Sequence, residues 1–147
     1  ALLFSIREAV MSDSFKGGCQ CGAVRYTVTA APMWGGHCQC TNCQKFSGTG
    51  HASNYLVPLD AFNVTGELSD FSYDADSGNK MTRYVCAVCA SPIYGVGSGN
   101  PAAAVVRAGS LDTPADFEPK ALIYTDSAVA WDGEEKSLPT FPKMPQR

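Results

Sequence analysis

The sequence predicts an all-β domain, and three observations lead to this prediction. Short runs rich in β-branched and aromatic residues recur along the chain, as in Ala23–Thr29 and Phe62–Thr65. Glycine, proline and aspartate clusters that are typical of turns separate these runs. No stretch shows the spacing of apolar residues that an ordinary amphipathic helix requires. We therefore expect a β-sheet fold with few or no regular helices.

The composition indicates one domain and excludes some partners. A chain of 147 residues is the size of one ordinary domain. Its 11 basic and 14 acidic residues give a formal net charge of -3, and no Lys or Arg cluster could neutralise a run of phosphates. We expect no nucleic-acid partner. We also expect no membrane partner, because no run approaches the roughly twenty apolar residues that span a bilayer. The oligomeric state stays open.

The first residues precede the patterned part of the chain. Their apolar block is short, and it has neither a basic lead nor a small-residue cleavage site, which argues against a signal peptide. We interpret Met11 as the natural start. Residues 1–13 are therefore expected to be a disordered leader or cloning remnant, and residues 14–147 a single domain with an irregular C-terminal tail.

The first elements alternate glycine turns with β-branched runs. Gly17–Gly22 is predicted to be a glycine-punctuated turn. Ala23–Thr29 follows as a strand, because it alternates and carries valine and threonine. A proline ends this strand, and Met33–Cys38 is the next short one. Thr41 is then expected to cap one helical turn, Asn42–Phe46.

Turn residues bound the remaining strands. His51–Val57 ends at a Pro-Leu-Asp-Ala turn, and the polar loop Asp74–Asn79 separates two further runs. Ala102–Ala108 is a mostly apolar run between a proline and a glycine, which favours a buried strand. The tail from Trp131 is expected to be irregular. The further strands expected are Phe62–Thr65, Leu68–Tyr73, Lys80–Val85 and Lys120–Thr125, and the knuckle of Cys86 and Cys89 leads into Ser91–Val96.

Seven cysteines fall into three groups along the chain. The groups are Cys19 and Cys21, then Cys38, Cys40 and Cys43, then Cys86 and Cys89. An odd number would leave one thiol over in a disulfide framework, whereas four ligands plus three use all seven. Neighbours in a Cys-x-Cys pair also rarely reach disulfide geometry. The pattern indicates metal binding in a reducing cytoplasm.

The spacing predicts two kinds of zinc site, because zinc favours four ligands in a tetrahedron and takes thiolate readily. Two close pairs separated by a long insert typically build a closed structural site, so we assign the first and last groups, the flanking cysteines, to one zinc. The central cysteines number only three. Such a site keeps a position for water or substrate, and a thiol bound there would be deprotonated. The sequence predicts a zinc-dependent domain that carries out thiol chemistry.

Other readings of these residues stay open. His37 or His51 could supply a fourth ligand and close the central site as a structural one. His37 is an awkward ligand, because neighbouring side chains on an extended segment point to opposite faces and Cys38 is its neighbour. A disulfide switch between Cys40 and Cys43 is a further alternative, although no thioredoxin-like βαβ pattern surrounds them. One or two cysteines could also be ordinary core residues.

The residues after the central cysteines are candidates for substrate binding. Lys45, Ser47, Gly48 and Gly50 could hold an anionic substrate through a cation, a hydroxyl and backbone N–H groups. The alternative is that they only shape the turn.

Further candidates lie in the loops and the tail. Tyr124 and Trp131 could line a pocket, although a tail tryptophan more often anchors its segment. Asp74, Asp76 and Asp126 are interpreted as solvated loop acids. Nothing in the sequence places a carboxylate near the central site to accept a proton.

The cysteine motifs resemble those of the glutathione-dependent formaldehyde-activating family, or S-(hydroxymethyl)glutathione synthase-like proteins. The resemblance covers roughly Ser14 to Pro142. It is carried by Gly18–Val24 (Gly-Cys-Gln-Cys-Gly-Ala-Val), His37–Cys43 (His-Cys-Gln-Cys-Thr-Asn-Cys), Cys86–Cys89 (Cys-Ala-Val-Cys), Ala108–Asp112, Ile123-Tyr124 and Ala130–Asp132.

This resemblance implies a zinc-bound β-sheet fold of the Mss4-like (β-tent) type with two zinc ions. The flanking cysteines Cys19, Cys21, Cys86 and Cys89 would hold the structural zinc, and the central cysteines Cys38, Cys40 and Cys43 the catalytic one. The implied reaction is that of a carbon–sulfur lyase, which joins glutathione, as co-substrate, to formaldehyde as a hemithioacetal. A different small thiol or aldehyde, and a non-catalytic zinc module that binds a protein partner, are the alternatives.

Two positions depart from the family pattern. Gln44 stands where a basic residue often follows the last central cysteine, with Lys45 one place later. This departure leaves the anionic substrate in question. Ala90 stands where glycine often follows the second knuckle, so its turn would have to form without the easy positive φ of glycine.

Overall fold

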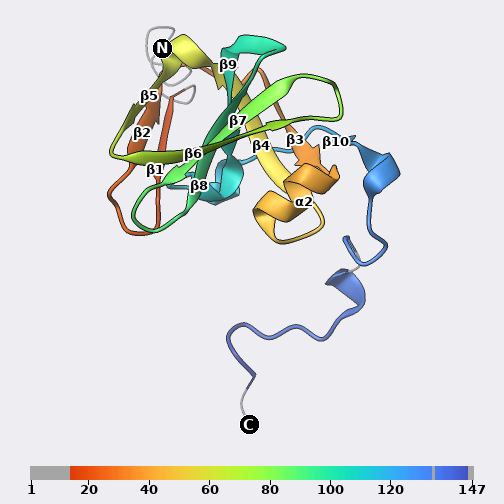
Figure 1. Cartoon of the computed structure of the whole chain (residues 1–147). Helices are drawn as coiled ribbons and strands as arrows, with labels where there is room; N and C mark the ends of the chain where they lie inside the picture. The colour runs from red at the N-terminus through yellow and green to blue at the C-terminus, as the bar shows by residue number, and fades with distance from the viewer. Residues whose placement is uncertain (1–13, 134, 146–147) are drawn as a thin grey trace, which may run out of the picture.

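The computed structural model describes residues 14–133 and 135–145 and consists mostly of β-sheet with one short helix (Figure 1). The prediction for residues 1–13 lies outside the described residues. The strands are β1 (Phe15–Gly18), β2 (Arg25–Val28), β3 (Trp34–Cys38), β4 (Ala52–Pro58), β5 (Phe62–Thr65), β6 (Leu68–Asp74), β7 (Lys80–Cys86), β8 (Pro92–Gly97), β9 (Asn100–Arg107) and β10 (Leu122–Ile123). The helix is α2 (Thr41–Ser47), and short 3-10 turns lie at Leu59–Ala61, Ala108–Ser110, Pro114–Asp116, Thr125–Ser127 and Glu135–Ser137.

The strands form two sheets. The smaller has the order β1-β2-β5, and the larger has the order β10-β3-β4-β9-β8-β7-β6 (Figure 1). Neighbours pair antiparallel except for β10, which runs parallel to β3 at the edge. Short connections explain the antiparallel pairs of consecutive strands from β6 to β9, since a hairpin needs few residues and a parallel crossover needs many. The pairs β2–β5 and β4–β9 join strands that are distant in sequence. The prediction of an all-β class is therefore confirmed.

The hydrophobic core lies where the two sheets meet. Alternate residues of β2 point inward, with Tyr26 2% exposed and Val28 fully buried. Val57, Ile93 and Val106 of the larger sheet are also fully buried. They belong to one cluster with the β2 residues. The alternation of buried and exposed positions fixes the register, because a slip of one residue would expose this set.

Most predicted strands are confirmed within one or two residues, but the first glycines form a strand rather than a turn. Gly17 and Gly18 belong to β1, where they pair with Tyr26 and Arg25. A Cβ at Gly17 would overlap the Tyr26 hydroxyl and the Ser110 carbonyl. These glycines therefore permit a close approach of strands, a use that the sequence pattern does not distinguish from a turn.

Three other boundaries correct the prediction. Pro101 does not precede β9 but lies in it, because the β8–β9 hairpin pairs Gly97 with Asn100. The run Lys120–Thr125 is a strand only over β10, since Tyr124 turns into the left-handed region at φ 58°. Thr41 is the first residue of α2 and not its cap.

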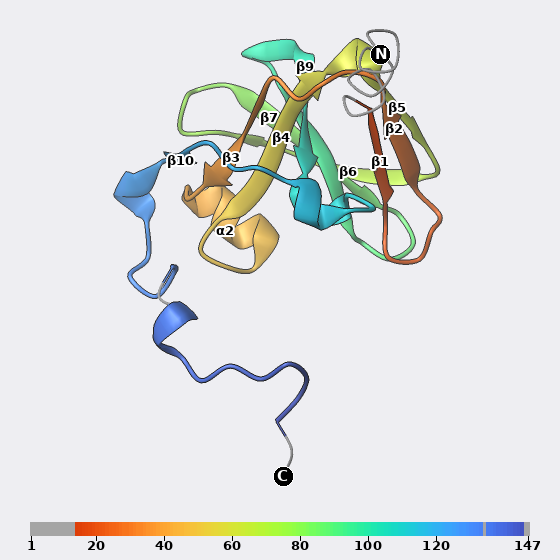
Figure 2. The same cartoon turned by 180° about the vertical axis from the view of Figure 1, so that it is seen from behind.

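Residues 135–145 extend away from both sheets, as Figures 1 and 2 show from opposite sides. Trp131 is 61% exposed, so it does not anchor the tail. Asp132 does so instead, because its Oδ2 lies 2.8 Å from Nδ1 of His51 and its side chain is only 6% exposed. Across the described part of the chain, no helix has both the length and the apolar character needed to cross a bilayer.

Candidate metal centres and cavity

The flanking cysteines converge although they are far apart in sequence. The sulfurs of Cys19, Cys21, Cys86 and Cys89 all lie within 4.8 Å of one another. Sγ of Cys21 is 3.6 Å from that of Cys19 and 3.8 Å from that of Cys86. A tetrahedron with Zn–S bonds of about 2.3 Å has edges of about 3.8 Å. The four-sulfur cluster is therefore compatible with zinc binding.

The polypeptide around the flanking cysteines supports thiolates. Backbone N–H groups of Val24 and Val88 donate to the sulfurs of Cys19 and Cys86 at 3.2 and 3.4 Å. The Ser91 hydroxyl lies 3.1 Å from Sγ of Cys89 and lowers the pKa of that thiol to about 5. Such outer contacts orient metal ligands and stabilise their charge.

Ala90 corrects the prediction for the second knuckle. The expectation was a turn made without a readily accessible positive φ, but Ala90 adopts φ 63°. Its N–H bonds to the Cys86 carbonyl at 2.9 Å, which closes the turn. The left-handed conformation costs a residue with a Cβ about 1–2 kcal/mol, so this turn is strained where glycine would not be.

The central cysteines lie at the junction of β3 and α2. Cys38 ends the strand, Cys40 is the N-cap of the helix, and Cys43 lies in its first turn. Sγ of Cys40 accepts a hydrogen bond from the Cys43 N–H at 3.4 Å. The three sulfurs lie within 4.8 Å of one another. The Cys40 side chain thus does the capping that was expected of Thr41.

The close packing of the three central thiols gives them different pKa values. The Cys43 thiol donates to Cys38, and this contact is the chief reason that the pKa of Cys38 falls to about 6. The same contact, together with burial, raises the pKa of Cys43. Burial raises the pKa of Cys40. A divalent ion would displace the shared proton, because cysteine binds metal as thiolate.

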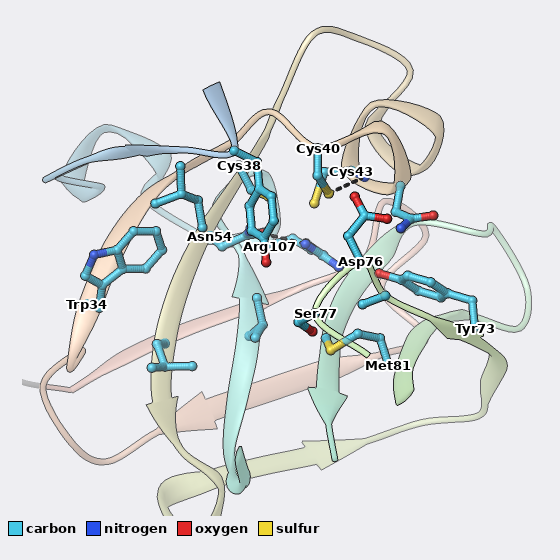
Figure 3. A pocket seen from close by; sticks show the side chains of 16 residues that line it. Trp34, Cys38, Cys40, Cys43, Asn54, Tyr73, Asp76, Ser77, Met81 and Arg107 are labelled. Atoms are coloured by element: carbon cyan, nitrogen blue, oxygen red, sulfur yellow. Dashed lines mark hydrogen bonds between the residues drawn. The ribbon is translucent and has the colours of Figure 1, made fainter. Parts of the chain in front are cut away.

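A cavity of about 270 Å³ opens beside the central cysteines (Figure 3). All three of these cysteines line it, so a ligand in the cavity would reach their sulfurs. Its walls come from β3, α2, β4, β6, β7 and β9, the loop after β6, and the segment around β10. The lining residues besides cysteine are Trp34, Asn42, Asn54, Leu56, Tyr73, Ala75, Asp76, Ser77, Met81, Val105, Arg107, Ile123 and Tyr124.

Arg107 is the buried cation of this cavity. It is 9% exposed, and its Nη1 donates to Oδ1 of Asn54 at 2.6 Å across the β4–β9 pair. Its Nε has no hydrogen-bond partner among the described residues. Burial lowers the pKa of Arg107, an effect opposed by the charge of Cys43. Within the described ranges, no carboxylate forms an ion pair with it.

Aromatic rings hold the arginines in place. The guanidinium of Arg107 lies 4.6 Å from the centroid of Phe46, and that of Arg83 lies 4.4 Å from the same ring. Tyr73 covers Arg83 at 4.4 Å. Cation–π contacts of this kind restrict the side chains. They connect α2, which contains Cys43 and is capped by Cys40, to the larger sheet.

The histidines occupy other positions. Nδ1 of His37 lies 2.8 Å from the Ser53 hydroxyl, and His51 pairs with Asp132. Neither histidine belongs to either sulfur cluster among the described residues. Burial lowers the pKa of His37, with His51 as a further cause. The arrangement gives no support to a histidine as fourth ligand of the central cluster.

The predicted substrate contacts do not line the cavity. Lys45 and Ser47 are exposed on α2, and Gly48 is its C-cap at φ 76°. The Ser47 hydroxyl accepts from the Thr49 N–H at 3.2 Å, a contact that shapes the turn. Gly50 is buried, and a Cβ there would contact Asp132 at 2.5 Å. Their role in binding substrate stays a prediction.

Gln44 also has a role within the fold. Its Nε2 donates to the carbonyls of Gln39 and Ser127, both at 2.9 Å. This side chain therefore joins α2 to the segment after β10, which borders the cavity.

Besides the central cysteines, the cavity is lined by residues that the sequence pattern did not mark as functional. Asp76 was interpreted as a solvated acid, yet it lines the cavity although exposed, and Figure 3 shows it on the side of Cys40 and Cys43. Asn54 and Arg107 were not singled out. A usable signal was present for Arg107, because an arginine at the end of an apolar strand is costly to bury without a function. Tyr124 does line the cavity, as one reading allowed.

Comparisons with known proteins agree with this geometry. A family model described as "Glutathione-dependent formaldehyde-activating enzyme" matches residues 14–127. Two curated proteins carry the name "Putative glutathione-dependent formaldehyde-activating enzyme". The one from Halomonas elongata is 32% identical over 84 residues, which cover 54% of this chain and 54% of that protein. The one from Penicillium rubens is 35% identical over 89 residues, which cover 57% of this chain and 46% of that protein. The chain thus spans about half the length of these curated relatives.

A solved structure supports the fold. The crystal structure of a Rhodobacter sphaeroides protein superposes with a TM-score of 0.53 at 20% identity. The match covers 66% of this chain and 87% of that one. At this identity the likeness concerns the fold alone.

Proposed function

The chain belongs to the glutathione-dependent formaldehyde-activating enzyme family, and on this premise we propose that it is a zinc-dependent carbon–sulfur lyase or synthase. The reaction joins the thiol of glutathione, or of another small thiol, to formaldehyde or a related aldehyde. A carbon–sulfur bond forms, the C=O π bond breaks, and the oxygen takes up a proton to give a hemithioacetal. The free thiols required for such a site are consistent with a reducing cytoplasm.

The observation that carries the proposal is the position of the central cysteines. Three sulfurs face a cavity of about 270 Å³, and they offer one ligand fewer than a closed tetrahedron requires. The flanking cysteines offer four sulfurs that pin β7 to the β1–β2 turn. We assign a structural zinc to the flanking cysteines and a catalytic zinc to the central ones. The catalytic ion would lower the pKa of the substrate thiol and so supply a thiolate at neutral pH.

The remaining cavity residues would position the reactants. Trp34 and Met81 form apolar walls, and Asn54 and Tyr73 offer polar groups to the same space. An aldehyde enclosed there would meet the thiolate in a restricted orientation, which lowers the entropic cost of the bimolecular step. Lys45, Ser47 and Gly48 would bind parts of the substrate outside the cavity.

Exchange NMR tests this proposal. Glutathione and formaldehyde form their adduct without catalyst, so the measured quantity is the exchange rate with and without zinc-loaded protein. We expect faster exchange with the protein and no acceleration with the Cys40→Ser variant or with an equal amount of free zinc. An unchanged exchange rate with wild-type protein would remove the enzymatic function and leave a zinc-binding interaction module as the alternative.

A further inference from the structure

Among the described residues, no carboxylate forms an ion pair that would compensate the buried charge of Arg107. Burial of an ion costs several kcal/mol unless another charge compensates it, and arginine stays protonated in proteins. Its protein partners are the neutral Asn54 and the ring of Phe46. Its Nε is buried without a hydrogen-bond partner in the described part of the chain. Negative charge on Cys43, Tyr73 or Cys38 would favour its protonated form, whereas the charge of Arg83 opposes it.

The charges around the cavity leave room for one more anion. Three thiolates with one divalent ion carry a single negative charge. Arg107 and the half-buried Arg83 together carry two positive charges. Asp76 also lines the cavity, but it is exposed and forms no ion pair with either arginine among the described residues, so solvent screens its charge. The buried groups therefore have one positive charge in excess until an anion enters. In a site of low polarity such an imbalance favours a charged ligand over a neutral one.

The geometry points to Arg107 as a substrate-contacting residue: we propose that its guanidinium stabilises the negative charge of the reacting molecule in the cavity. This inference rests on the proposed function. The charge is first that of the glutathione thiolate. When the sulfur attacks the aldehyde carbon, the electron pair of the C=O π bond moves to oxygen, and the charge moves with it. Arg107 then donates to this alkoxide until a proton from water neutralises it, as preorganised donors do in other acyl and carbonyl reactions.

The surrounding contacts prepare the guanidinium for this role. Phe46 restricts one face of the group, and Asn54 fixes one edge. The guanidinium is thus held in position on the cavity wall before substrate arrives. Figure 3 shows the Arg107 side chain in the cavity between the central cysteines and Tyr73. A donor that needs no rearrangement contributes most to charge stabilisation.

A competing explanation is that Arg107 only packs against Phe46 and Asn54. The preference of the protein for glutathione over S-methylglutathione distinguishes a packing role from charge stabilisation, because only glutathione can supply a thiolate. The measured quantity is the ratio of the two dissociation constants, determined by calorimetry without aldehyde. Zinc content is determined on the same samples, so that each variant is compared at two ions per chain.

Two variants change the charge in different ways. Arg107→Gln removes it, and Asn54→Asp keeps the shape and the hydrogen bond but gives the guanidinium a carboxylate partner. Both should lower the preference for glutathione about tenfold to a hundredfold, the value of a hydrogen bond to a charged group. Arg107→Lys should retain most of the preference. Arg25→Gln, which removes an exposed arginine paired with Asp112, should leave the ratio unchanged.

The outcomes are distinct. A preference that survives both Arg107→Gln and Asn54→Asp would overturn the role of Arg107 while leaving the proposed function intact. If Arg107→Lys loses as much of the preference for glutathione as Arg107→Gln does, Arg107 has a packing role only. If Arg107→Gln does not fold, Asn54→Asp decides, because it preserves the packing. Wild-type protein that binds neither ligand would overturn both the inference and the proposed function.

Discussion

Replacement of Cys40 by serine should separate its proposed role as metal ligand from its role as helix cap. Sγ of Cys40 accepts the N–H of Cys43 at 3.4 Å, so the side chain caps α2. Serine is among the preferred N-caps, and alanine at such a position costs about 0.5–2 kcal/mol. A serine hydroxyl is a far poorer zinc ligand than thiolate. Cys40→Ser should therefore lose the central metal and keep the helix.

The magnitude follows from comparison with alanine at the same position. Both variants should hold one zinc ion per chain instead of two, as measured by elemental analysis. Cys40→Ala also loses the cap, which we take as about 1 kcal/mol. For a chain of this size that difference lowers the melting temperature by roughly 2–4 °C relative to Cys40→Ser. Circular dichroism against temperature measures the difference.

A matched variant in the other cluster provides the control. Cys86 is 1% exposed and belongs to the core between the sheets. Cys86→Ser should therefore reduce the folded fraction itself, because structural zinc contributes directly to folding. The reasoning is refuted if Cys40→Ser retains two zinc ions, or if it unfolds as completely as Cys86→Ser does.

Three further predictions concern stability and are checked by urea titration. Ala90→Gly should raise the free energy of unfolding by up to about 1 kcal/mol, because it relieves the strain of φ 63°; a decrease would contradict this. Gly66→Ala should lower it by about 2 kcal/mol or more, since φ is 104° and the Cβ would overlap the backbone of residues 23 and 24. Gly22→Ala, at φ 84° with open space, should cost less; equal costs would argue against the overlap. Tyr26→Phe should lower the free energy of unfolding by about 0.5–1.5 kcal/mol, because it removes the buried 2.7 Å hydrogen bond to Ser110. An unchanged free energy of unfolding would show that this hydrogen bond does not contribute to stability.

The sequence was sufficient for the class of fold and for the grouping of the cysteines. Strands such as Phe62–Thr65 carry their pattern locally, in residues that prefer a pleated surface and in the glycine that follows. The groups of cysteines are local as well, since Cys38, Cys40 and Cys43 lie within six residues. Convergence of Cys19 with Cys86 is not local, but a shared metal is the simplest reason for two such pairs.

Other features depend on contacts that no local pattern contains. Gly17 has the same local appearance as a turn glycine, yet its position is explained by the Tyr26 hydroxyl across the strand. Asp76 has the sequence of a solvated loop acid and lines the cavity only because the loop after β6 folds beside α2. Arg107 shows its importance through burial without an acidic partner, which is a property of the assembled sheet.

X-ray absorption at the zinc edge tests the central claim, an open three-sulfur zinc that takes a thiolate, most directly. With four sulfurs at one ion and three at the other, the zinc-loaded protein should show a mean of about 3.5 sulfurs and one light atom for every two ions. Addition of glutathione should raise this mean to about four sulfurs, and S-methylglutathione should leave it unchanged. A first shell that is already complete with sulfur or imidazole, and that glutathione does not alter, would contradict the account.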